Sequence, residues 1–103
     1  MAIRFYDTNA ILTDSTDISN VIISSKTLEE LENIKSSSHK DNDIKYKARV
    51  AVRAIREQKP AIVVVQKSDY DKIEELGLEI TNDNLIIASA WRYSQENPIV
   101  FVT

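Results

Sequence analysis

The feature that most constrains the fold of this chain is the alternation of short apolar runs with segments of helical length. The runs are rich in apolar and β-branched residues typical of strands, at residues 3–6, 21–23, 61–65 and 99–102. The segments between them predict helices, at residues 26–35, 44–58, 68–76 and 82–96. Strands joined by helical crossovers form parallel sheets. We therefore expect an α/β fold, a three-layer α/β/α arrangement around a central parallel sheet of about four strands.

Composition limits the organisation and the classes of function. The chain has 103 residues, of which 43% are hydrophobic and 28% charged, as in a single globular domain over residues 1–103. It contains no Cys, which excludes disulfides and cysteine nucleophiles. No apolar run approaches the roughly 18 residues that cross a bilayer and no signal peptide precedes the first strand, so we expect a cytoplasmic protein with no membrane partner. The net charge of −3 gives no overall attraction to nucleic acid.

Asp7 follows the first apolar run directly, at the end of a strand where open α/β sheets place their ligands. Two explanations of this carboxylate stay open. It can be the N-cap of a turn that begins at Asn9 or Ala10, or it can be a ligand for a hard cation. The run at residues 61–65 is apolar at odd and even positions alike, which predicts a central strand covered on both faces.

A glutamate of the helix after the second strand is a second candidate ligand. A helical wheel centred on Leu31 turns Glu29 away from the sheet and leaves Glu30 and Glu32 on the margins of the apolar stripe. Glu30 is the better candidate, because it belongs to the first turn and is nearer the strand ends. The alternative is a capping box, in which Thr27 caps the helix and Glu30 folds back onto the cap.

Asp83 is a third acid at an equivalent place, because it opens the helix before the last strand. An acid in a first helical turn is also favoured by the helix dipole, whatever else it does. Taken together, the three acids are expected to converge on one edge of the sheet.

Arginines recur on one face of the helix at residues 44–58, at positions Arg49, Arg53 and Arg56. We expect Arg49 and Arg53 to contact phosphates at one side of the acidic cleft. The alternative is a solvated basic face with no ligand.

Five segments of the chain resemble, in the right order, the successive signatures of a PIN domain: residues 6–12, 27–35, 48–53, 82–90 and 100–103. The resemblance is closest to the PIN domain that precedes the helicase-like module of phosphate-starvation-inducible ATPases of the PhoH type. It implies a PIN-like fold and metal-dependent endonucleolytic cleavage of single-stranded RNA with Mg²⁺ or Mn²⁺. It also implies pairing as a homodimer and a downstream ATPase domain in a longer chain.

The same resemblance implies roles for single residues. Asp7, Glu30 and Asp83 correspond to the catalytic metal ligands, and Asn9 and Thr103 to polar residues that support the site. Carboxylates without Cys or a suitable His are typical ligands of hard cations such as Mg²⁺ and Mn²⁺.

Two other functions are compatible with a small α/β chain of this kind. A PIN-like domain with a degenerate centre serves as a non-catalytic module that binds RNA or another protein. A phospho-receiver domain needs a phosphoacceptor Asp after its third strand. Here that strand is followed by Gln66, Lys67 and Ser68, which disfavours the receiver.

The last signature departs from the family pattern, because in PIN domains it continues through Thr and one further residue to a fourth acid. This sequence ends at Thr103. We therefore expect a domain truncated at the C-terminus, with weak or absent nuclease activity from this chain. We also expect an exposed strand edge or apolar patch near Val100 and Val102 that promotes self-association.

Overall fold

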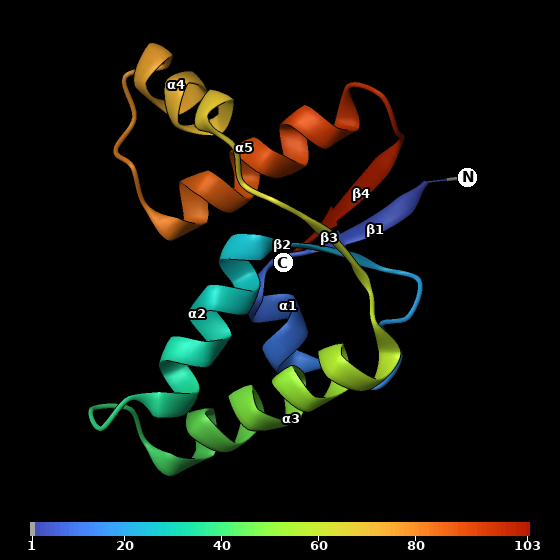
Figure 1. The fold of residues 1–103 in the computed structure, drawn as a ribbon, viewed down its shortest axis with the longest axis vertical. Coiled ribbons are helices and arrows are strands. Elements are labelled where there is room, and N and C mark those ends of the chain that lie inside the picture. The colour runs from blue at the N-terminus through green and yellow to red at the C-terminus, as the bar shows by residue number, and fades with distance from the viewer. Residues whose placement is uncertain (1) are drawn as a thin grey trace.

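The structure, a computed structural model, describes residues 2–103 and contains four strands and five helices (Figure 1). The strands are β1 (Ile3–Tyr6), β2 (Ile22–Ser24), β3 (Ala61–Val63) and β4 (Ile99–Val102). The helices are α1 (Thr8–Thr13), α2 (Ser25–Ser36), α3 (Asn42–Gln58), α4 (Lys67–Glu75) and α5 (Asn82–Ser94). All strand pairs are parallel, in the order β3-β2-β1-β4. The expected α/β/α fold around a parallel sheet is confirmed.

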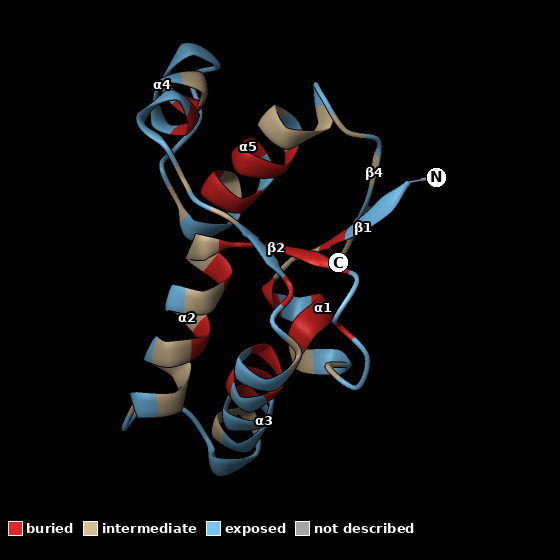
Figure 2. Cartoon of the chain, turned by 45° about the vertical axis from the view of Figure 1, so that its right-hand side comes forward, coloured by how far each residue is buried: buried red, intermediate tan, exposed pale blue. Residues whose placement is uncertain are grey.

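The helices form layers on the two faces of the sheet, with α1, α2 and α3 on one side and α5 on the other (Figure 1). Side chains alternate between these layers along each strand. Phe5 and Ile22 pack with Ile86 and Ala90 of α5. Ile23 instead joins the larger core against α1, α2 and α3. Helix α4 packs on α5, and the buried residues gather on β2 and on the inner sides of the helices (Figure 2).

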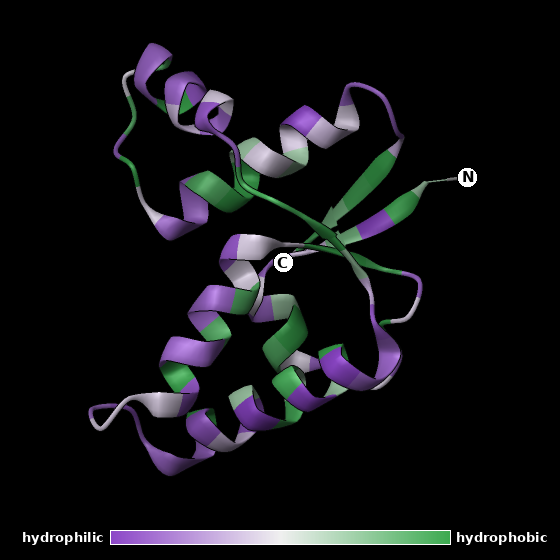
Figure 3. Ribbon diagram, viewed as in Figure 1, coloured by the Kyte–Doolittle hydropathy of each residue, from purple (hydrophilic) through white to green (hydrophobic). Residues whose placement is uncertain are grey.

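Helices α2 and α3 are amphipathic, with hydrophilic and hydrophobic residues alternating along them (Figure 3). Asp41 caps α3 by accepting a hydrogen bond from the Ile44 N–H at 3.0 Å, so this helix begins two residues before the expected start. Lys59 ends it in the left-handed conformation, immediately before Pro60. Among residues 2–103, no helix is both long and apolar enough to cross a membrane.

The prediction of a central third strand over residues 61–65 is wrong. Strand β3 ends at Val63 and lies at the edge of the sheet, where it pairs with β2, and Ile62 is exposed. Beyond Val63 the backbone bonds to side chains, because the Val64 carbonyl accepts from Arg92 and the Val65 N–H donates to Ser25. An apolar run predicts a strand but not its place in the sheet.

Strand β4 forms the opposite edge of the sheet and pairs with β1. Val100 is 52% exposed and Val102 is partly exposed. The expected exposed strand edge near these two residues is confirmed.

Candidate functional site

A cleft of about 880 Å³ lies where β1 and β4 end, bounded by α1, α2 and α5. All five residues expected to form or support the site line it: Asp7, Asn9, Glu30, Asp83 and Thr103. Asp7 and Thr103 directly follow β1 and β4, so the cleft opens at the carboxyl edge of the parallel sheet, where such folds bind ligands.

Asp7 is held by its backbone and by its side chain. Its N–H donates to the Val102 carbonyl at 3.0 Å, and its Oδ1 accepts from the Ala10 N–H at 2.9 Å as the N-cap of α1. The capping explanation is thus confirmed, with the helix beginning at Thr8, one residue earlier than expected. Among residues 2–103, the Asp7 Oδ2 atom makes no hydrogen bond. A carboxylate can therefore cap α1 with one oxygen and offer the other to the cleft.

Glu30 lines the cleft from the second turn of α2, one turn further along than expected. The N-cap of this helix is Ser24, whose Oγ accepts from the Lys26 N–H, so the capping box of Thr27 with Glu30 is wrong. The Glu30 Oε2 accepts from the Asn82 Nδ2 at 3.1 Å, which connects α2 with the start of α5.

Glu29 and Glu30 point in different directions. The Glu29 Oε1 pairs with the Lys26 Nζ at 3.1 Å on the exposed side of α2 and does not line the cleft. Glu32, the other candidate, pairs with Lys35 and Arg56. Of the acids on α2, Glu30 is therefore the one that faces the cleft.

Asp83 is the second residue of α5, after the N-cap Thr81, and its side chain is exposed on the cleft wall. The Thr81 Oγ1 already accepts from the Asn84 N–H at 3.1 Å, so Asp83 is not needed as the cap. In the first turn its negative charge also interacts favourably with the helix dipole. This role is compatible with that of a metal ligand.

A buried hydrogen bond between two threonines positions the helices that carry Asp7 and Glu30. The Thr8 Oγ1 donates to the Thr27 Oγ1 at 3.3 Å, and both side chains are buried. Thr8 is next to Asp7, and Thr27 is one turn before Glu30. Thr27 was expected only as a helix cap, and nothing in the local sequence indicated that it meets Thr8.

The basic residue of the cleft wall differs from those expected. Arg49 and Arg53 lie on the exposed side of α3 and do not line the cleft, because the buried Ala48, Ala51 and Val52 face the core. Lys40, in the connector before α3, lines it instead. A lysine in a polar connector has no periodic pattern, so the sequence held no signal for it.

The side chains that line the cleft offer oxygen atoms, the type of ligand that hard cations prefer. Of the described residues that line it, the carboxylates of Asp7, Glu30 and Asp83 and the neighbouring amides offer oxygen, and none is His or Cys. Within residues 2–103, however, no three His, Cys, Asp or Glu side chains lie close enough to hold one ion together. The structure brings the acids to one cleft without gathering them into a single ligand set.

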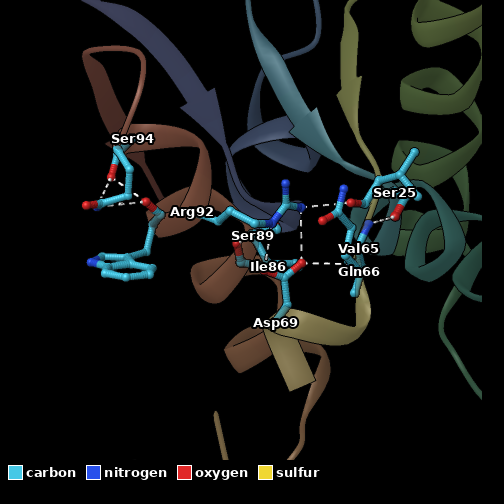
Figure 4. Close-up of polar contacts among 11 residues, drawn as sticks. Ser25, Val65, Gln66, Asp69, Ile86, Ser89, Arg92 and Ser94 are labelled. Carbon is cyan, nitrogen blue, oxygen red and sulfur yellow. Dashed lines mark hydrogen bonds and ion pairs between the residues drawn. The ribbon is translucent and has the colours of Figure 1, made fainter. Parts of the chain in front are cut away.

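A second polar cluster, away from the cleft, joins α4 to α5 (Figure 4). The Arg92 guanidinium binds both carboxylate oxygens of the buried Asp69, with its Nε at 2.9 Å from Oδ1 and its Nη2 at 3.1 Å from Oδ2. The Gln66 N–H also donates to the Asp69 Oδ2 at 2.9 Å. The sequence gives no signal for this pair, because an acid in a first helical turn fits the same local pattern whether its side chain is solvated or buried.

The comparisons with known proteins give one family. A family model described as PIN domain matches residues 5–103, almost the whole chain, and the matched region contains Asp7, Glu30 and Asp83. Neither the search of curated proteins nor the search of solved structures gave a match. With this match and a four-stranded parallel sheet between helical layers, the chain belongs to the PIN domain family.

Proposed function

We propose that this chain is a metal-dependent endoribonuclease that cleaves single-stranded RNA in the cleft lined by Asp7, Glu30 and Asp83. Members of the PIN domain family are commonly metal-dependent nucleases, and PIN nucleases typically bind RNA. The observation that carries the proposal for this chain is that three acids from three different helices or helix caps line one cleft at the carboxyl edge of the sheet.

Asp7, Glu30 and Asp83 would hold Mg²⁺ or Mn²⁺, with Asn9 and Thr103 supporting the site. Such an ion polarises a phosphodiester and lowers the pKa of its bound water. Two of the three acids are held in place by hydrogen bonds. Asp7 is fixed by β4 and α1, and Asn82 holds one oxygen of Glu30. Holding one ion would require the side chains of these three acids to turn toward one another on the backbones that carry them.

Basic side chains would bind the RNA backbone at two places. Among the described residues that line the cleft, Lys40 is the one with a basic side chain, so it would bind a phosphate there. Arg49 and Arg53 lie on the outer face of α3, so they would contact RNA outside the cleft rather than at the scissile phosphate. Among residues 2–103, neither arginine is paired with a carboxylate.

The resemblance of five segments to the PIN domain of phosphate-starvation-inducible ATPases supports two further proposals. The domain would act beside a helicase-like ATPase module, and two copies would pair.

The test is an assay of cleavage of a fluorescently labelled single-stranded RNA with Mn²⁺, with EDTA and with a DNA of the same sequence as controls. We expect weak cleavage of the RNA, which EDTA and Asp7→Asn abolish. Cleavage that survives Asp7→Asn would contradict the proposed site. Binding of RNA without any metal-dependent cleavage would favour the non-catalytic RNA-binding module instead.

A further inference from the structure

A small apolar groove lies between α4 and α5, beside the acidic cleft. It has a volume of about 170 Å³. Its walls include Lys72 and Ile73 from α4, the C-cap Leu76, and Ile87 and Trp91 from α5. Pockets that enclose drug-sized molecules have roughly 300–1,000 Å³, so this groove suits a single planar ring. None of the described residues that line it is Asp or Glu.

Trp91 gives this groove an aromatic surface that is open to solvent. The residue is 49% exposed, and the Lys72 Nζ lies over one face of its ring, 4.7 Å from the centroid. Lys72 also pairs with Glu75 at 3.6 Å, which keeps the ammonium group close to the helix surface. Proteins bind single-stranded nucleic acid by combining aromatic rings, on which bases stack, with cations that attract the phosphates. A base that stacks on this face of Trp91 would take the place of the Lys72 ammonium group, which would then attract the adjoining phosphate.

The groove and the cleft adjoin one another along α5. Ile87 lines both of them. Asp83, Ile87 and Trp91 are spaced by four residues, so they follow one another along one side of the helix. At 1.5 Å per residue, Trp91 lies about 12 Å along the axis from Asp83. This distance corresponds to about four nucleotides of a stacked strand at about 3.4 Å each, and to fewer if the strand is extended.

The walls of the groove are held in place before any ligand binds. The buried Asp69 of α4 is paired with Arg92 of α5, the residue next to Trp91, through two hydrogen bonds. Ile73 of α4 packs with Leu85 and Ala88 of α5 beneath the groove. A preformed groove loses less conformational freedom when a ligand binds than one that must first assemble.

We propose that this groove is a base-stacking subsite, in which Trp91 binds a nucleobase of the single-stranded RNA whose scissile phosphate lies in the acidic cleft. The proposal rests on the proposed function for the identity of the ligand. Stacking does not depend on which base is present, so the subsite would set the length and path of the bound RNA rather than its sequence.

Trp91 is the only tryptophan of the chain, so its fluorescence reports on the groove directly. The experiment titrates the unmodified protein with a uridine octanucleotide and with a uridine dinucleotide, with Ca²⁺ in place of Mn²⁺. Fluorescence anisotropy of the labelled RNA measures affinity in parallel. We expect the octanucleotide to quench Trp91 saturably, while the dinucleotide binds at least about tenfold more weakly, because it is too short to span both sites.

Two substitutions separate stacking from apolar packing. Trp91→Leu keeps an apolar side chain but removes the ring, and should weaken octanucleotide binding about 5- to 150-fold, the range expected for one stacked base. Trp91→Phe keeps an aromatic face and should weaken it by less than about fivefold. Equal affinity of the wild type and Trp91→Leu, without quenching in the wild type, would overturn the proposal.

The outcomes also distinguish the groove from the nuclease function. Cleavage with Mn²⁺ but no quenching would overturn the subsite and leave the nuclease. Quenching without cleavage would support the subsite and overturn the nuclease function. Absence of both binding and cleavage would overturn both proposals. Fluorescence that changes with protein concentration but not with RNA would show that a second copy of the chain covers the groove, which also overturns the subsite.

Discussion

At the scale of single residues, Asp7 combines two roles that the sequence had left as alternatives. Its Oδ1 caps α1, and its Oδ2 makes no hydrogen bond among residues 2–103. The two roles can be separated by substitution. Asn caps a helix about as well as Asp but carries no charge, whereas Ala can neither cap the helix nor bind a cation.

The prediction for Asp7 uses thermal unfolding with and without Mn²⁺. At an ion concentration 100-fold above its Kd, binding stabilises the wild type by about 2.7 kcal/mol. Asp7→Asn should lose most of this stabilisation while its Tm without metal stays close to that of the wild type. Asp7→Ala should lose it too and should also be less stable without metal by about 1 kcal/mol. An undiminished effect of Mn²⁺ on Asp7→Asn would exclude Asp7 as a ligand.

Glu30 and Glu29 form a matched pair for a second prediction, because they are neighbours on α2 but only Glu30 lines the cleft. Glu30→Gln keeps an acceptor for Asn82 and removes the charge, so it should weaken Mn²⁺ binding by about tenfold or more. Glu29→Gln removes an exposed ion pair with Lys26, which contributes little. Isothermal titration with Mn²⁺ measures both, and equal affinities of the two variants would contradict the assignment of Glu30.

At the scale of elements, one ion pair with a buried carboxylate links α4 to α5. Asp69 is 2% exposed, whereas the Arg92 side chain is 29% exposed and also donates to the Val64 carbonyl at 2.9 Å. This arrangement ties α4, α5 and the end of β3 together (Figure 4). The Asp69 carboxylate has little contact with water, so the Arg92 guanidinium is needed to stabilise its negative charge.

Arg92→Leu should destabilise the protein by about 3 kcal/mol, the lower end of the range for breaking a buried pair, because Arg92 is partly solvated. The double variant Asp69→Asn with Arg92→Leu should recover part of that loss, because it leaves no unpaired buried charge. Urea unfolding followed by circular dichroism gives the three free energies of unfolding. A double variant no more stable than Arg92→Leu would show that the lost packing of the arginine, rather than the buried charge, is the cause.

At the scale of the whole molecule, β3 and β4 are the two edges of the sheet. The β4 edge is apolar, with Val100 and Phe101 both exposed. Unpaired backbone groups next to apolar side chains favour pairing with another chain, and natural proteins often prevent it with a lysine.

We therefore predict that the protein self-associates with rising concentration and that Val100→Lys opposes this. Val50→Lys is the matched control, because Val50 is similarly exposed but lies on helix α3 and belongs to no strand. Sedimentation velocity over a range of concentrations should show a dissociation constant raised by at least about tenfold for Val100→Lys and little changed for Val50→Lys. The same effect from both variants would mean that general surface polarity, not the β4 edge, controls association.

The sequence by itself determined the elements and the residues that end them. Strand β4 has the expected bounds, and the predicted helix boundaries lie within two residues of those in the structure, apart from α1, which appeared only as a turn after Asp7. Side-chain periodicity, Asp41 as a cap and Pro60 as a stop act over a few residues, so a linear reading captures them. The placing of Asp7, Glu30 and Asp83 at one edge followed from the same local pattern, because parallel strands end together.

The tertiary structure decided what depends on contacts between distant segments. It put β3 at an edge although its residues suit a buried strand, because an apolar run is compatible with several strand orders. It turned Arg49 and Arg53 to solvent and brought Lys40 to the cleft. It also paired Asp69 with Arg92 across 23 positions of sequence. The free energy of each contact depends on a geometry that exists only once the helices have packed, so no local pattern encodes it.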